Sequence, residues 1–394
     1  MSDRIQKIVA QLPDLKSVTT VWDTAESRLA EGDAAFVADL GIALANKYGS
    51  RATEVWQYRS VFDRLLRLLT TAPGRGHIEQ ALRLLSAGGS GSGSASGAGA
   101  GAGAAKRKPA RYAASLLAAG QAPENLTAVF AGGSSRARAS EELRMCLVHE
   151  LVLRGVALGD FPEIERWATS PHWSHHPLAW LPLELSALEE APPLPSYTVS
   201  GSSYSMPYGP QDGPGATLSK AAHIPSATAS TTEAFSEAAT AAVANWAEES
   251  NGRSEAVTYE LAEPFEAGAL PDLLVSLDLE CLRGVGPRKR LALASCPPDD
   301  AWRILFAAAS TGGAYNNGEY GAYGRLAAWR SVAALSGAPT EATPAEVERS
   351  AQACDWHSFG AATKWFEGVA WDIGLVSVAP NARRLAILVA TDTD

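Results

Sequence analysis

The chain has 394 residues, of which 46% are apolar and 19% are charged, and its net charge is −10. This length predicts two or three domains, each with enough apolar residues to bury a core, so the composition excludes a chain that is disordered throughout. Residues 233–280 hold eleven acidic residues and one basic residue, Arg253. An acidic surface there repels phosphate backbones, which argues against nucleic acid as a general partner.

The sequence favours a cytoplasmic protein that neither crosses nor binds a membrane. The longest uncharged stretch, residues 86–105, contains only Ala, Gly and Ser, which are too weakly apolar for lipid. Asp3, Arg4 and Lys7 lie where a signal peptide needs its apolar run. No Cys-x-x-Cys pair is present, so we expect four buried cysteines that act as small apolar side chains: Cys146, Cys281, Cys296 and Cys354.

Helical patterns dominate the first half of the chain. Between residues 55 and 69, apolar residues recur every three or four positions, which predicts an amphipathic helix. The polar positions of this helix include Arg59, Asp63, Arg64 and Arg67. Three shorter ranges have helical patterns as well: 77–85, 111–119 and 141–155. Since no fixed repeat period is present, we predict a helical bundle or a set of helical hairpins.

The domain organisation follows from two breaks in composition. The first is an Ala/Gly/Ser tract, predicted as a flexible linker or insertion over residues 86–109. It separates a helical module over 1–85 from a helical continuation over 110–190. The second break, over 191–215, is rich in Pro, Gly and Tyr, which predicts a loop. The remaining residues, 216–394, form the last predicted domain.

This last domain alternates between helical and strand patterns. A strand–helix–strand unit is predicted from alternation at 257–261, a helical stretch at 269–282 and a second strand at 288–295. Four helices follow, and they begin near positions 299, 319, 343 and 361, the last one covering residues 361–373. Two apolar runs about a Pro-Asn turn predict a hairpin at 375–378 and 384–391. The fold class is thus a helical N-terminal module followed by an α/β domain with a small mixed sheet and a C-terminal hairpin.

The richest candidate site is the Gly/Tyr/Asn loop at residues 312–325 between two predicted helices. Glycines let a backbone approach a ligand closely, amides fix its orientation, and tyrosines offer a flat face with a polar tip. The candidate ligand-binding residues are Tyr315, Asn316, Asn317, Tyr323 and Arg325, the last as the partner of an anion. The structural alternative is a tight interhelical turn, in which Gly318, Gly321 and Gly324 let another helix pack close.

A second candidate is the basic turn at residues 284–290. Its Gly-Val-Gly-Pro-Arg-Lys run resembles the hairpin of helix-hairpin-helix DNA-binding motifs and makes Arg288 and Lys289 candidates for nucleic-acid contact. Only one copy is present, and the stretch before it is strongly acidic. A basic turn that enters a strand is the alternative explanation.

Other polar clusters point to no metal, cofactor or catalytic site. His172 and His176 would share a face on a helix, but Pro171 and Pro177 bracket them, which favours a surface turn. Asp372 forms a carboxylate cluster only if the sheet brings it to two aspartates near the last strand, Asp392 and Asp394. The sequence has no Gly-x-Ser-x-Gly elbow, Walker A loop, His-Glu-x-x-His helix or Gly-x-Gly-x-x-Gly fingerprint, which lowers the expectation of an enzyme.

Three passages resemble a known family. They are Gly313-Ala314-Tyr315 with residues 321–330, then residues 371–375, and the ending 388–394. Together they are similar to an uncharacterised family of actinobacterial proteins, a domain of unknown function seen in Streptomyces-like genomes, mainly over the C-terminal half. The resemblance implies a bacterial cytoplasmic protein and brings no activity, so no functional residue is carried over.

The leading hypothesis is a non-catalytic interaction or regulatory protein that recognises a protein or a small ligand through the loop 312–325. A small-ligand-binding protein or enzyme with its pocket at that loop is the first alternative, and it predicts a defined cavity there. Nucleic-acid binding through the turn 284–290 is the second alternative, and it predicts a gel shift that depends on Arg288 and Lys289.

Overall fold

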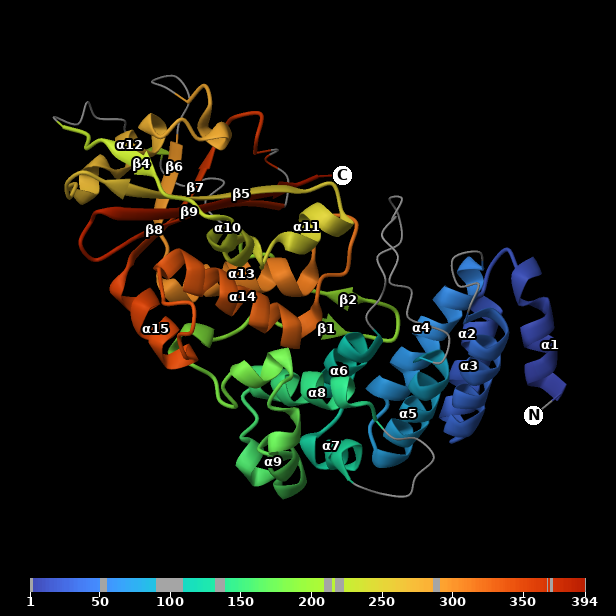
Figure 1. Cartoon of the computed structure of the whole chain (residues 1–394). Helices are drawn as coiled ribbons and strands as arrows, with labels where there is room; N and C mark the ends of the chain where they lie inside the picture. Colours follow the sequence, from blue (N-terminus) through green and yellow to red (C-terminus); the bar gives the residue numbers. More distant parts are fainter. Residues whose placement is uncertain are drawn as a thin grey trace. The chain divides into compact units, whose positions relative to one another are not determined.

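The computed structural model describes residues 3–49, 55–89, 109–131, 139–208, 215–216, 223–285, 291–366, 368 and 371–393. These residues form two compact units (Figure 1). The first unit comprises the chain up to Ser174 together with Pro195–Ser203, and the second comprises His175–Leu194 and the chain from Tyr204 onward. Residues 175–190 were predicted as part of the helical continuation and residues 191–194 as part of the loop, and all of them belong to the second unit. Residues 90–108 of the predicted linker lie outside the described residues.

The described part of the first unit is built from helices, as predicted. They are α1 (Asp3–Gln11), α2 (Thr19–Ala30), α3 (Ala34–Tyr48), α4 (Trp56–Thr71), α5 (Arg75–Gly89), α6 (Pro109–Gly120), α7 (Pro123–Phe130), α8 (Glu141–Leu153) and α9 (Pro162–Ala168). Short 3-10 turns η1 (Leu12–Asp14), η3 (Leu158–Asp160) and η4 (Pro171–Trp173) lie between them. Helix α4 packs on α2, α3, α5 and α6 through its apolar face, which includes the fully buried Val61, Leu65 and Leu69.

A small hairpin completes the first unit. Strand β1 (Ser196–Tyr197) pairs antiparallel with β2 (Ser202–Ser203). The Tyr197 hydroxyl lies 2.9 Å from Oγ of Ser115 on α6, and the Tyr197 ring lies edge-on to the ring of Tyr112, with centroids 6.3 Å apart. These contacts hold the hairpin against α6.

The second unit contains a seven-stranded sheet in the order β3-β6-β7-β8-β9-β5-β4. The strands are β3 (Gly215–Ala216), β4 (Ala227–Ala229), β5 (Arg253–Leu261), β6 (Leu291–Ser295), β7 (Asp355–Ala361), β8 (Trp371–Val378) and β9 (Arg384–Asp392). The predicted α/β domain and its C-terminal hairpin, β8 with β9, are confirmed. The sheet is not mixed as predicted, because every described pair is antiparallel.

Helices cover both faces of this sheet (Figure 1). One face carries Leu385, Ile387 and Val389 of β9 in a core cluster with α12 (Leu270–Ser276). The other face meets α14 (Tyr320–Ser336), and α13 (Pro298–Thr311) packs along α14. The remaining helices and 3-10 turns of this unit are α10 (Glu233–Thr240), α11 (Ala244–Glu249), α15 (Pro344–Ala353), η5 (Pro177–Trp180), η6 (Ala187–Glu189), η7 (Ala267–Ala269) and η8 (Glu280–Leu282).

One predicted helix is wrong. The described residues within 361–373 form no helix, because β7 ends at Ala361 and β8 begins at Trp371. Trp371 pairs with Asp392, so the hairpin extends four residues further than the alternation in the sequence indicated. Trp365 and Phe366 enter the core cluster beneath the sheet instead of forming a helical stripe. Tertiary packing thus overrides the local helical pattern here.

Among the described residues, no helix has both the length and the apolar character needed to span a bilayer.

Gly374 marks a close approach of two strands. A Cβ at this position of β8 would lie 2.3 Å from the carbonyl oxygen of Phe359 on β7. We expect Gly374→Ala to lower the free energy of unfolding by about 1–3 kcal/mol, because the extra methyl group overpacks this contact. Gly268→Ala is the matched control, since a Cβ there has nothing within 4 Å. Urea denaturation of both variants checks this, and an equal effect of the two would contradict it.

All four cysteines are buried and none forms a disulfide, as expected. Burial raises the pKa of the Cys281 and Cys296 thiols to about 12. Because the thiolate is the reactive form, we expect the native protein to react slowly with an aromatic disulfide reagent at mildly alkaline pH. In concentrated guanidinium chloride all four thiols should react at once. A rapid stoichiometric phase in the native protein would speak against this burial.

Candidate functional site

The loop at residues 312–319 reverses the chain between α13 and α14. Gly312 and Gly318 have φ angles of 84° and 63°, in the region that favours glycine. A Cβ on Gly312 would lie 1.8 Å from Oδ1 of Asn316, and a Cβ on Gly318 would lie 2.5 Å from the Gly312 nitrogen. The two glycines are therefore needed for the turn itself.

The backbone of this loop is held by hydrogen bonds from three directions. Oδ2 of Asp392, at the end of β9, accepts the N–H of Ala314 at 2.7 Å. Oδ1 of Asn316 accepts the N–H groups of Gly313 and Gly318 at 3.2 and 2.9 Å. The Asn316 amide also donates to the Asn245 carbonyl oxygen at 2.7 Å. Asn316 was predicted as a ligand-binding residue, and the structure places its amide in the framework of the loop.

Two of the five predicted site residues face solvent. Tyr315 is 57% exposed, and its backbone N–H donates to Oγ of Ser250 at 3.1 Å. Asn317 is exposed beside it. Tyr323 is half-buried, with its ring 6.4 Å from the His176 ring. The loop therefore presents Tyr315 and Asn317 on a fixed backbone.

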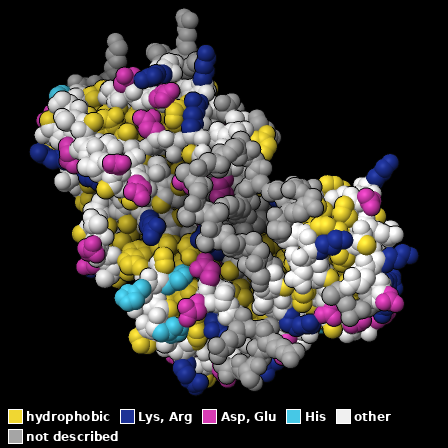
Figure 2. All heavy atoms as spheres, turned by 45° about the vertical axis from the view of Figure 1, so that its right-hand side comes forward, with side chains coloured by type: hydrophobic (Ala, Val, Ile, Leu, Met, Phe, Trp, Pro, Cys, Tyr) yellow, Lys and Arg dark blue, Asp and Glu magenta, His cyan; other side chains and the backbone are white. Residues whose placement is uncertain are grey.

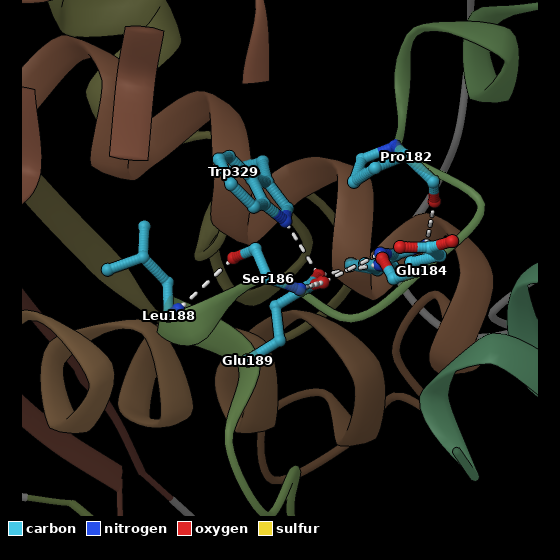
Figure 3. A network of polar contacts seen from close by, with 7 residues as sticks. Pro182, Glu184, Ser186, Leu188, Glu189 and Trp329 are labelled. Carbon is cyan, nitrogen blue, oxygen red and sulfur yellow. Dashed lines mark hydrogen bonds and ion pairs between the residues drawn. The ribbon is translucent and has the colours of Figure 1, made fainter. Parts of the chain in front are cut away.

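Arg325 is fully buried and forms an ion pair with Glu189 of η6, and Figure 3 shows the polar network around Glu189. Its Nε and Nη2 donate to the two carboxylate oxygens of Glu189, each at 2.6 Å. Its Nη1 and Nη2 also donate to the backbone carbonyls of Pro182 and Glu184 at 2.9 and 3.0 Å.

Glu189 is satisfied by two further donors, the Trp329 indole N–H at 2.7 Å and the Ser186 backbone N–H at 3.0 Å. In Figure 3 the indole of Trp329 points at the carboxylate. The charge of Arg325 is compensated inside the fold, in contrast to its predicted role as the partner of an anionic ligand.

The aspartates at the end of the sheet do not form the carboxylate cluster. Asp372 pairs in register with Thr391, while Asp392 pairs with Trp371. Since cross-strand partners share a face and neighbours along a strand alternate, Asp372 and Asp392 project to opposite faces. Asp372 accepts the Thr391 hydroxyl and the N–H of Gly368, both at 2.7 Å. Asp394 lies outside the described residues.

The remaining candidates carry no described site. Arg288 and Lys289 lie outside the described residues, and strand β6 begins just after them. His172 and His175 are exposed, as a surface turn predicts, and Figure 2 shows histidine side chains grouped on one face. Within the described ranges, no three His, Cys, Asp or Glu residues form a group that could hold a metal ion.

One cluster was not predicted from the sequence. The polar positions of α4 line a cavity of about 440 Å³ in the first unit, together with Trp22 and Trp56. In the sequence these arginines are polar positions of an amphipathic helix, a pattern that by itself indicates no site. The signal that could have indicated a site is the combination of three arginines with Trp56 on the same face of the helix.

Removing either member of the buried ion pair between Arg325 and Glu189 should lower the stability of the fold. We expect Arg325→Met and Glu189→Leu each to lower the free energy of unfolding by about 3–5 kcal/mol, because each leaves a buried charge unpaired. The double variant should be more stable than either single variant, since it buries no unpaired charge. Urea denaturation of the three variants measures this. Additive losses would show that the two charges do not interact.

The comparisons with known proteins identify a family for this chain and no activity. Residues 19–394 match the model of a family described as a family of unknown function, DUF6183. The match covers most of the first unit as well as the second, and so extends beyond the C-terminal half that carries most of the resemblance. No curated protein and no solved structure matches the chain. Since the family model matches far more than half of its length, this chain belongs to the family of unknown function DUF6183.

Proposed function

We propose that this chain is a non-catalytic recognition protein that binds a protein partner through Tyr315 and Asn317. The observation that carries the proposal is the exposure of Tyr315, 57%, on a loop whose backbone is fixed by Asp392, Asn316 and Ser250. A loop whose backbone is already held loses little backbone entropy on binding, and tyrosine is enriched at protein interfaces.

The surroundings of Tyr315 favour a partner with basic side chains. The hydrogen bond to Ser250 places the Tyr315 backbone next to the end of α11, where Glu248 is exposed. The face of a tyrosine ring attracts a guanidinium or ammonium group, and a carboxylate at the rim steers such a group during encounter. We therefore assign the loop to recognition of a Lys- or Arg-bearing protein surface.

A small ligand at this loop is less well supported. The side-chain amide of Asn316 makes three hydrogen bonds within the protein, and the guanidinium of Arg325 is paired with the Glu189 carboxylate. Nucleic-acid binding through Arg288 and Lys289 stays a prediction. The proposal includes a bacterial cytoplasmic setting, which the four unpaired cysteines support, because cysteines stay reduced there.

A photo-crosslinking amino acid at position 315 tests the proposal in cells. We expect a discrete protein adduct from position 315 and none from position 204, since Tyr204 is an exposed tyrosine of the same unit, 44% accessible. With the identified partner purified, Tyr315→Ala should weaken binding about tenfold or more, whereas Tyr204→Ala should leave it unchanged. Added salt should slow association.

Two results would overturn this assignment. One is the same set of adducts from positions 315 and 204, which indicates contact by chance. The other is equal affinity of the wild type and Tyr315→Ala for the captured partner, which makes Tyr315 a bystander.

A further inference from the structure

The first unit contains a second candidate site, independent of the loop at Tyr315. We infer that the cavity along α4 binds a small ligand that combines a planar ring with a phosphate group, of which a nucleoside monophosphate is the simplest class. The cavity measures about 440 Å³. This lies within the range of small-molecule sites, about 300–1,000 Å³.

One face of α4 supplies most of the lining. Its lining residues are spaced three or four positions apart, which puts them on a single side of the helix: Trp56, Arg59, Ser60, Asp63, Arg64 and Arg67. Trp22 of α2 adds an indole from a neighbouring helix, and the turn that follows β1 closes the cavity. The walls thus come from packed helices and a pinned hairpin of the same unit.

The cavity carries excess positive charge. Three guanidinium groups and only one carboxylate, that of Asp63, line it. Asp63 lies 3.3 Å from Nε of Arg67, and Arg64 pairs with Glu26 outside the lining. Arg59 is exposed and has no ion-pair partner among the described residues. Arginine is the preferred partner of phosphate because its planar fork donates two parallel hydrogen bonds.

One buried donor in the lining lacks an acceptor. The indole N–H of Trp22 is buried and makes no hydrogen bond, whereas Nε of Arg67 lies 3.3 Å from the Asp63 carboxylate. The Arg67 side chain is held in place, since Nη1 donates to the Thr198 carbonyl at 3.5 Å and the guanidinium lies over the Tyr112 ring. Buried N–H groups without acceptors are rare, and an acceptor on a bound ligand would satisfy the Trp22 indole.

The tryptophans of the lining are the reason for proposing a planar ring in the ligand. Trp56 is 52% exposed, which is unusual for so large an apolar side chain and leaves its indole open for stacking. The Trp22 ring is already covered by the Arg64 guanidinium, whose centre lies 5.3 Å from the ring centroid. A base stacked on Trp56 would bring its phosphate toward Arg59, one helical turn further along the same face.

Isothermal titration calorimetry of the full chain at low salt tests this inference. The probes are the four common nucleoside 5′-monophosphates, with adenosine, inorganic phosphate and anthranilate as partial ligands. We expect at least one monophosphate to bind about tenfold or more tightly than each partial ligand, because only it engages both Trp56 and Arg59. Binding should weaken as salt is added.

Variants then assign the contacts. Trp56→Ala and Arg59→Gln should each weaken binding of that monophosphate about tenfold, whereas Trp56→Phe and Arg59→Lys should retain part of the affinity. Arg83→Gln is the matched control, as Arg83 is a partly exposed arginine of the same unit that does not line the cavity. Tyr315→Ala should bind like the wild type, so failure here leaves the protein-recognition proposal unaffected. Thermal melting verifies that every variant is folded.

Three outcomes overturn the inference. The first is no heat of binding with any monophosphate at millimolar concentration. The second is inorganic phosphate or anthranilate binding as tightly as the monophosphates while Trp56→Ala has no effect, which indicates an unspecific anion site. The third is binding of a single-stranded oligonucleotide without binding of any mononucleotide.

Discussion

The second unit depends on the buried ion pair between Glu189 and Arg325. Moving two charges out of water costs free energy. The pair is tolerated because the Glu189 carboxylate accepts hydrogen bonds from the Arg325 guanidinium and from the Trp329 indole. The same guanidinium serves the carbonyls of Pro182 and Glu184, whose irregular segment lacks the regular bonds of a helix or strand. The network thereby fixes the path of residues 175–194 across the unit to which they belong.

Helix α14 connects this network to the exposed loop. Arg325 lies on its second turn, and Gly324 beside it lets α13 approach so closely that a Cβ would lie 2.7 Å from Cβ of Ser310. The loop is anchored at its other side by Asp392 of β9, an interior strand of the sheet. Tyr315 is therefore carried by a helix pair and a sheet at once, which makes its exposure a property of the framework rather than of a loose connection.

Local signals predicted much of this fold, and long-range contacts account for what they missed. The period of α4, the Thr343 cap of α15 and the β8–β9 hairpin depend on residues close in sequence, and all three are present. The partner of Arg325 lies 136 residues away, so nothing near that arginine revealed that its charge was already paired. Asn316 looked free for a ligand for the same reason, since its bond to Asn245 crosses 71 residues. The cavity along α4 likewise depends on a hairpin that arrives from a distant part of the chain.

The position of β9 sets an order of events during synthesis. In the described sheet, β9 is the strand that joins the β5–β4 pair to the other four strands. Until residues 384–392 have left the ribosome, β5 has no strand on its β9 side, and apolar side chains such as Val257 remain uncovered. The first unit, whose contacts are more local, can form before that moment. A nascent chain therefore carries a folded helical unit together with an incomplete sheet. A chaperone would have the most effect at this point of synthesis, because the sheet still exposes apolar side chains.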